Sequence, residues 1–262
     1  MSDPGDDESF DMFQEPPDYF QPEKPATFAT HALRSGETLH IRLVGHNPLW
    51  GHLLWNAGRT VATYLEDGAA TLVAGKTVLE LGAGGGLPSL VCALRGAAKV
   101  VVTDYPDPDL VENLAFNVTN CLEGSETAQR IRGGYLWGAA IDDLLACLPA
   151  PEPDAAASEP GFDLLILADL LFNHSEHAKL LATVQKTLKR SKDAKALVFF
   201  TPYRPWLMEK DLAFFDLARE NEFAVENILE AYMPNVMFEG DPGDERLRRT
   251  VFGYELTWNN LD

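Results

Sequence analysis

A short apolar strand that runs into a cluster of glycines constrains this chain more than any other feature. Residues 77–81 favour a β-strand, and glycine occupies positions 82, 84, 85 and 86. Glycines at the end of a strand let a ligand approach the backbone N–H groups, and they are costly in conformational entropy without such a reason. A second predicted strand, residues 99–103, ends in Asp104. In nucleotide-binding βαβ units an acid at that place meets the ribose hydroxyls. The two features together predict a ribose-containing cofactor.

The spacing of the glycines indicates which cofactor. A dinucleotide-binding loop needs a third glycine at the position of Leu87, so a dinucleotide oxidoreductase is disfavoured. The spacing that fits is Glu80-x-Gly82-x-Gly84-x-Gly86. This pattern resembles motif I of the Rossmann-like S-adenosylmethionine-dependent methyltransferases, in which the acid lies near the methionine end of the cofactor. The alternative is a tight strand-to-helix turn that binds nothing.

From residue 77 onward the predicted strands and helices alternate, which is typical of a doubly wound parallel sheet. Near the end of the chain this alternation stops. Residues 223–232 and 249–258 are both strand-like with no helix between them, and they predict an antiparallel hairpin. We therefore predict an α/β, Rossmann-like fold with a mostly parallel seven-stranded sheet and helices on both faces. The earlier strands are expected near 77–81, 99–103, 131–136, 162–168 and 196–201, and the helices near 88–96, 108–121, 139–147, 175–190 and 206–221.

The remaining segments suggest one domain with an extension. Residues 1–30 are rich in acids and proline and predict a partly disordered arm, which leaves residues 31–262 as the domain. Residues 38–44 alternate like a strand, and residues 149–160 predict a flexible insertion. The stretch that begins at Pro48 predicts a helix with one buried face, because its apolar residues have helical spacing: Leu49, Trp50, Leu53, Leu54, Ala57, Val61 and Leu65.

Composition limits the partners. The net charge of −19 disfavours nucleic acid and suits a basic protein or peptide, although it also fits a role in solubility alone. We expect a cytoplasmic monomer without membrane contact, because no apolar run is long enough to span a bilayer and the sequence starts with acids. Cys92, Cys121 and Cys147 are widely spaced and have no partnered histidines, so we expect buried thiols and no metal site.

The predicted cofactor contacts lie at the carboxyl ends of the strands, where open α/β sheets bind ligands. The two carboxylate oxygens of Asp104 are expected to accept hydrogen bonds from ribose hydroxyls. Trp137 offers a flat face to an adenine ring, with an ordinary core tryptophan as the alternative. The predicted set is Trp55, Glu80, Gly82, Ala83, Gly84, Asp104, Trp137 and Ala168.

The predicted catalytic residues follow the fourth strand of the alternating series. Asp169 stands where a transferred methyl group would point, and it is expected to hold and orient an amine by accepting a hydrogen bond. Of the aromatic residues Trp55, Phe172 and Tyr203, the first two are expected to offer faces to a methylated ammonium, with ordinary core packing as the alternative for each. His174 is open to two interpretations, a base or a support at the start of the next helix.

On these residues the chain resembles the seven-β-strand protein lysine methyltransferases, and within them the fungal nicotinamide N-methyltransferase-like proteins that act on elongation factor 1-alpha. The similar segments are residues 13–19, 47–58, 80–86, 103–106 and 169–177. The resemblance implies S-adenosylmethionine as cofactor and methylation of the N-terminal glycine and adjacent lysine of a partner with a basic N-terminus. It also implies cofactor contacts from Trp55, residues 82–84, Asp104, Trp137 and Ala168.

One residue departs from the family pattern. Many related lysine methyltransferases carry Asp-x-x-Tyr after this strand, whereas this chain has Phe172, which cannot donate a hydrogen bond. Two other functions remain open at this point. One is a small-molecule N-methyltransferase that acts on a pyridine-like amine, and the other is a binding module that kept the fold without the activity.

Overall fold

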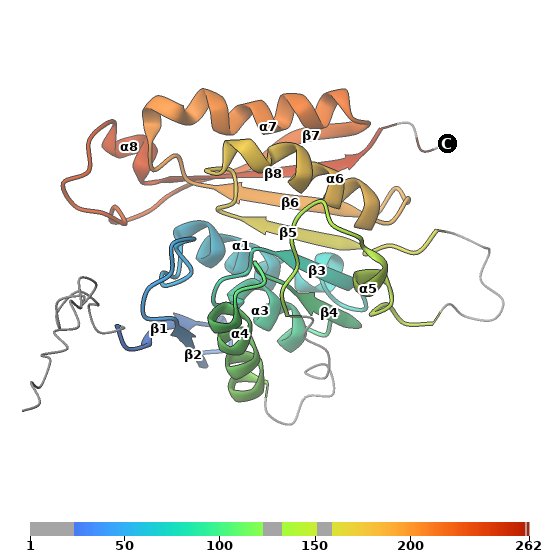
Figure 1. Ribbon diagram of the computed structural model, residues 1–262, viewed down its shortest axis with the longest axis horizontal. Helices are drawn as coiled ribbons and strands as arrows, with labels where there is room; N and C mark the ends of the chain where they lie inside the picture. Colours follow the sequence, from blue (N-terminus) through green and yellow to red (C-terminus); the bar gives the residue numbers. More distant parts are fainter. Residues whose placement is uncertain (1–23, 123–132, 151–158, 260, 262) are drawn as a thin grey trace, which may run out of the picture.

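A six-stranded mixed sheet forms the centre of the computed structural model, which describes residues 24–122, 133–150, 159–259 and 261 (Figure 1). Within these residues β4, β3, β5 and β6 are parallel, and β8 is antiparallel to both β6 and β7. The predicted mostly parallel sheet with an antiparallel end is confirmed. In spatial order its strands are β4 (Lys99–Val102), β3 (Thr77–Leu81), β5 (Leu164–Ala168), β6 (Lys195–Phe200), β8 (Thr250–Trp258) and β7 (Phe223–Tyr232).

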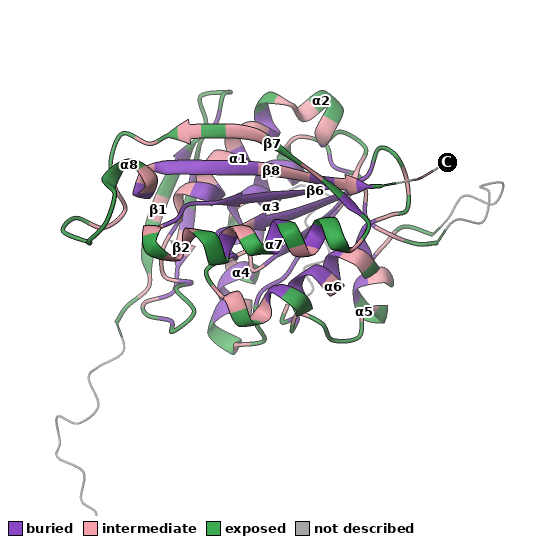
Figure 2. Ribbon diagram, turned by 90° about the horizontal axis from the view of Figure 1, so that it is seen from above, coloured by how far each residue is buried: buried purple, intermediate pink, exposed green. Residues whose placement is uncertain are grey.

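Helices cover both faces of this sheet, because successive strand residues point to opposite sides. In β3, Val78 packs with one core cluster and Leu79 with the other. Figure 2 shows the central strands buried between the helices. The first face is covered by α1 (Asn56–Asp67), α3 (Leu87–Leu94) and α4 (Pro108–Cys121), and the second by α5 (Asp142–Leu145), α6 (His177–Thr187) and α7 (Met208–Glu220).

A separate antiparallel pair, β1 (Thr27–Ala32) and β2 (Thr38–Leu43), packs beside α4. Asn117 of α4 ties this pair to the glycine loop, because its amide donates to the carbonyl oxygens of Arg42 and Gly85 at 2.9 Å each. The predicted strand at 38–44 is confirmed. Residues 27–30 of the predicted arm belong to β1, whereas residues 1–23 lie outside the described part, so the division at residue 30 stays a prediction.

The predicted helix at Pro48 begins too early, since α1 starts at Asn56. Residues 48–53 form turns, and Trp50 has a left-handed backbone with φ +64°. A residue with a Cβ atom rarely adopts a left-handed conformation, and a right-handed helix cannot continue through it. The helical spacing of Leu49, Trp50 and Leu53 therefore does not mark a helix. The buried face over Ala57, Val61 and Leu65 is confirmed.

Two expected elements after the second strand are much shorter than predicted. Of the strand expected at 131–136, the described residues contain a single bridge between Gly134 and Asp104. A Cβ atom at Gly134 would lie 2.3 Å from Cα of Pro106, so the chain passes too close there for ordinary strand residues. The helix expected at 139–147 is reduced to α5, because Gly138 before it has φ +81° and Pro149 follows.

The other short elements are connections at the ends of longer ones. They are α2 (Ala69–Leu72), α8 (Glu245–Arg248) and the 3-10 turns His174–Glu176 and Pro205–Leu207. Residues 151–158 of the predicted insertion fall outside the described residues. Cys92 and Cys147 are buried as expected, whereas Cys121 is partly exposed. In the part of the chain that the structure describes, every helix is too short or too polar to cross a bilayer.

Candidate active site

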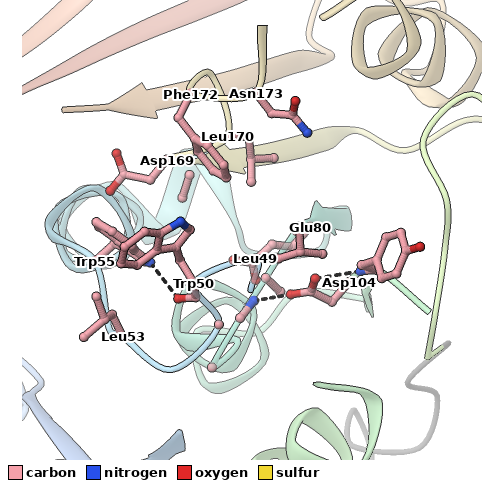
Figure 3. A pocket seen from close by; sticks show the side chains of 18 of the residues that line it. Leu49, Trp50, Leu53, Trp55, Glu80, Asp104, Asp169, Leu170, Phe172 and Asn173 are labelled. Atoms are coloured by element: carbon pink, nitrogen blue, oxygen red, sulfur yellow. Dashed lines mark hydrogen bonds between the residues drawn. The ribbon is translucent and has the colours of Figure 1, made fainter. Parts of the chain in front are cut away.

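A cavity of about 340 Å³ lies at the carboxyl ends of β3, β4 and β5, and every predicted site residue lines it. Figure 3 shows Glu80 and Asp104 on one side of this first cavity and Trp50 and Trp55 on the other. The residues come from loops far apart in the sequence, and the parallel strands bring their ends to one edge. The predicted members are Trp55, Glu80, Gly82, Ala83, Gly84, Asp104, Trp137, Ala168, Asp169 and Phe172.

The glycine loop needs glycine for two separate reasons. Gly82 and Gly84 both have left-handed backbones, with φ +59° and +54°. At Gly82 there is also no room for a side chain, because a Cβ would lie 2.5 Å from Leu170 and 3.3 Å from Trp137. The loop therefore turns tightly from β3 into α3 and leaves its backbone facing the cavity.

Asp104 is fixed by backbone donors at the end of β4. Its Oδ2 accepts from the N–H of Gly84 and its Oδ1 from the N–H of Tyr105, both at 2.6 Å. Burial raises the pKa of this carboxyl, and the two hydrogen bonds oppose the rise. Each oxygen keeps a second lone pair, so the side chain can still accept hydrogen bonds from two hydroxyls of a ligand.

Glu80 lies deeper in the wall and is almost completely buried, with 1% of its surface exposed. Its Oε2 accepts from the N–H of Ser89 at 2.9 Å, in the first turn of α3. Burial raises the pKa of Glu80 to about 8, against the opposing effect of this bond. A buried acid of this kind favours a cationic group of a ligand beside it.

Asp169 lines the first cavity and is hydrogen-bonded to two other segments of the chain. Its Oδ1 accepts from the N–H of Thr201 at 2.9 Å and its Oδ2 from the N–H of Ala57 at 3.2 Å. These bonds hold the end of β5 against the end of β6 and the start of α1, and the residue itself has φ +57°. Figure 3 shows the carboxylate turned away from Glu80 and Asp104. Burial raises the pKa of Asp169 to about 7.

A second cavity, of about 280 Å³, adjoins the first. Four residues line both cavities, namely Trp50, Trp55, Asp169 and Phe172. The remaining wall comes from the segment after β5, from β6 and the segment after it, from α7 and from the connection between β7 and β8: Leu171, Phe200, Thr201, Tyr203, Arg204, Asp211, Phe238 and Asp241.

His174 lies behind this second cavity rather than in its wall. Its Nε2 is 2.7 Å from Oδ1 of Asp211, and Asp211 is the member of the pair that lines the cavity. Burial raises the pKa of Asp211, and the nearby imidazole lowers it. The side chain of His174 thus contacts α7 and does not cap the helix that follows it, and both roles considered for it stay predictions.

Several wall residues were missed from the sequence. Trp50 was assigned to the buried face of a helix, yet 46% of its surface is exposed and it lines both cavities. The turn residues around it, Pro48 and Gly51, were the signal that could have corrected this. Phe238 and Asp241 carry no local signal, because only the return of the chain from β7 to β8 brings them here.

The chain is similar to known proteins over most of its length. A family profile described as lysine methyltransferase matches residues 34–221. Similar chains include "Protein N-terminal and lysine N-methyltransferase efm7" of Aspergillus fumigatus, 51% identical over 95% of this chain and 93% of that protein. The protein of the same description from Candida albicans is 43% identical over 94% of each chain.

Solved structures share the fold at low identity. The YcgJ protein of Bacillus subtilis covers 77% of this chain and 99% of its own, at a TM-score of 0.52 and 15% identity. TYW2 of P. horikoshii in complex with MeSAdo covers 92% of this chain and 74% of its own, at a TM-score of 0.50 and 15% identity. At such identities the likeness concerns the fold alone.

Proposed function

Because the chain belongs to the lysine methyltransferase family, we propose that it methylates the N-terminal glycine and adjacent lysine of elongation factor 1-alpha. It is a methyltransferase with S-adenosylmethionine as cofactor. The N-terminal activity is supported by relatives 43% to 51% identical to this chain, which are named protein N-terminal and lysine N-methyltransferases. The particular target comes from the resemblance of the segments at 47–58 and 169–177 to the fungal proteins. The acidic net charge of −19 supports a basic partner.

One observation carries the proposal most strongly. A cavity with the chemistry of a nucleoside site adjoins a second, aromatic cavity, and Asp169 lies in the wall that both share. A transferase needs donor and acceptor sites that meet at one point, because alignment of the reacting atoms supplies much of the rate.

The residues of the first cavity fit the cofactor. Asp104 would accept hydrogen bonds from the ribose hydroxyls, and the backbone at 82–84 would lie along the nucleoside. Glu80 would face the cationic methionine end, where a positive charge offsets the cost of its burial. Trp137 would stack beside the adenine, and the small side chain of Ala168 leaves room next to it. When bound, S-adenosylmethionine would supply a sulfonium methyl group, whose carbon bonds to the lone pair of the amine nitrogen as the carbon–sulfur bond breaks and the thioether leaves.

The protein must then provide a neutral, aligned amine. An α-amine has a pKa of about 7.7–8.0 and a lysine amine one of about 10.4, and a partly dry pocket lowers either value. Asp169, held by two backbone donors, would accept a hydrogen bond from the amine and orient it, while the proton leaves to water. Phe172 would contribute an apolar face and no hydrogen bond.

The direct test is mass spectrometry of elongation factor 1-alpha after incubation with the enzyme and S-adenosylmethionine. We expect mass gains of one to three methyl groups on the N-terminal peptide and further gains on its lysine. In Asp104→Asn, cofactor affinity should fall about tenfold or more, since a charged acceptor of ligand hydroxyls is lost. The matched control is Asp193→Asn, an exposed aspartate before β6. An unmodified terminus would refute the target, and methylation of nicotinamide instead would favour the small-molecule function.

A further inference from the structure

Four aromatic side chains in the wall of the second cavity form a cluster in which each ring lies near at least two of the others. The centroid of Trp55 lies 5.0 Å from that of Tyr203 and 5.8 Å from that of Phe238. Trp50 lies 6.3 Å from both Trp55 and Phe238, and Tyr203 lies 6.0 Å from Phe238. Aromatic faces gathered in this way attract ammonium groups through their quadrupoles.

Charge in the second cavity favours a cation as well. Three carboxylates line it, namely Asp169, Asp211 and Asp241. Among the described lining residues the one permanent cation is Arg204, and its guanidinium donates to the carbonyl oxygen of Phe172 at 3.0 Å. Burial raises the pKa of both Asp169 and Asp211, and a cation entering the cavity would reverse that effect.

Phe238 and Asp241 belong to the connection between β7 and β8, which the protein holds firmly. The buried Arg248 donates from Nη1 to the carbonyl oxygen of Phe238 at 3.0 Å. At the base of the connection, Arg249 donates from Nε to the carbonyl oxygen of Met233 at 2.9 Å. Phe238 is therefore placed by the fold, and it reaches the second cavity without touching the first.

We propose that the second cavity binds the acceptor amine of the protein substrate, with Trp55, Tyr203 and Phe238 around the methylated ammonium that the transfer produces and Asp241 beside the adjacent lysine. The β7–β8 connection then decides which amine is accepted, because it supplies both Phe238 and Asp241. This inference rests on the proposed function and adds to it the residues that select the substrate. Asp241 is exposed, so it suits a basic side chain that stays at the mouth of the cavity.

The test compares variants of the full chain with a synthetic peptide that begins with glycine and lysine. Phe238→Leu keeps the apolar bulk and removes the aromatic face, and Phe238→Tyr restores the face. Asp241→Asn removes the charge, and Glu239→Gln is its matched control, since Glu239 is exposed on the same connection and lies outside the cavity wall. For each variant, calorimetry gives the dissociation constant of S-adenosylmethionine and initial rates give KM and kcat for the peptide.

We expect KM for the peptide to rise about tenfold in Phe238→Leu and to recover in Phe238→Tyr. In Asp241→Asn we expect KM to rise about threefold and to depend less on salt. Glu239→Gln should match the parent, and the dissociation constant of the cofactor should stay the same throughout. Cofactor binding distinguishes the role of the second cavity from the proposed function. If the parent chain binds no S-adenosylmethionine, the proposed function itself is wrong.

Three results would overturn the assignment. One is an unchanged KM in both Phe238→Leu and Asp241→Asn while cofactor binding is intact. Another is a change in cofactor affinity equal to the change in KM, since Phe238 would then act on the first cavity. The third is methyl transfer to nicotinamide that depends on Phe238 while the peptide is not methylated, because the cavity would then take a small aromatic amine.

Discussion

Glu80 should destabilise the folded protein at neutral pH, so Glu80→Gln should stabilise it. The carboxyl is 1% exposed, and burial raises its pKa from an ordinary 4.5 to about 8. Between those values the unfolded chain releases a proton that the folded chain keeps. The contribution of Glu80 to the free energy of unfolding is therefore greatest below pH 4.5 and is lost as the pH rises through about 8.

The size of the effect follows from the same values. Each pKa unit corresponds to about 1.4 kcal/mol, so the loss between about pH 5 and about pH 8 amounts to about 3 kcal/mol. A glutamine of similar shape carries no charge and can still accept the hydrogen bond from the N–H of Ser89. In the absence of cofactor, the advantage of Glu80→Gln should thus be small at about pH 5 and about 3 kcal/mol larger at about pH 8.

Urea unfolding followed by circular dichroism at both pH values measures this difference. The control is Glu112→Gln, because Glu112 is an exposed residue of α4, and its stability curve should run parallel to that of the parent. A Glu80→Gln advantage that is the same at both pH values would refute the reasoning, as would a loss of stability at both.

Two further predictions concern the neighbouring loop and the shared wall. Gly82→Ala should lower the free energy of unfolding by about 1–2 kcal/mol, because the left-handed φ of +59° and the close approach to Leu170 both oppose a Cβ atom. The same change should weaken cofactor binding. Thermal melts measure the first effect and calorimetry the second. In the parent, kcat/KM for peptide methylation should rise with pH through about 7, because Asp169 of the free enzyme ionises there. In Asp169→Asn, kcat/KM should be at least about tenfold lower and that step should vanish. A step that persists in Asp169→Asn would assign the titration to another group.

Local sequence determined the first cavity. The glycine loop, Glu80 and Asp104 each occupy the end of a predictable strand, and the ends of parallel strands must meet at one edge. For this reason the strand pattern predicted most of the site residues, while Trp55 was predicted from the family resemblance, and the structure places all of them around one cavity. The same reasoning predicted the terminal hairpin of β7 and β8, because no helix separates these strands.

Local patterns were misleading where backbone conformation overrides side-chain spacing. The apolar residues before Leu54 have helical spacing, yet the left-handed Trp50 delays the helix to Asn56. Likewise the strand expected at 131–136 is reduced, within its described residues, to a bridge at Gly134, where the chain passes too close to Pro106. Neither effect is visible in hydrophobic periodicity.

The second cavity was decided by tertiary structure. Trp55, Tyr203 and Phe238 come from three segments with unrelated local patterns, and their rings meet only because β8 inserts between β6 and β7. That strand order carries the β7–β8 connection to the carboxyl edge of the sheet, beside the segment that follows β6. Sequence alone thus predicted a nucleoside site, since that prediction depends on strand ends, whereas the aromatic wall depends on long-range packing that no short segment encodes.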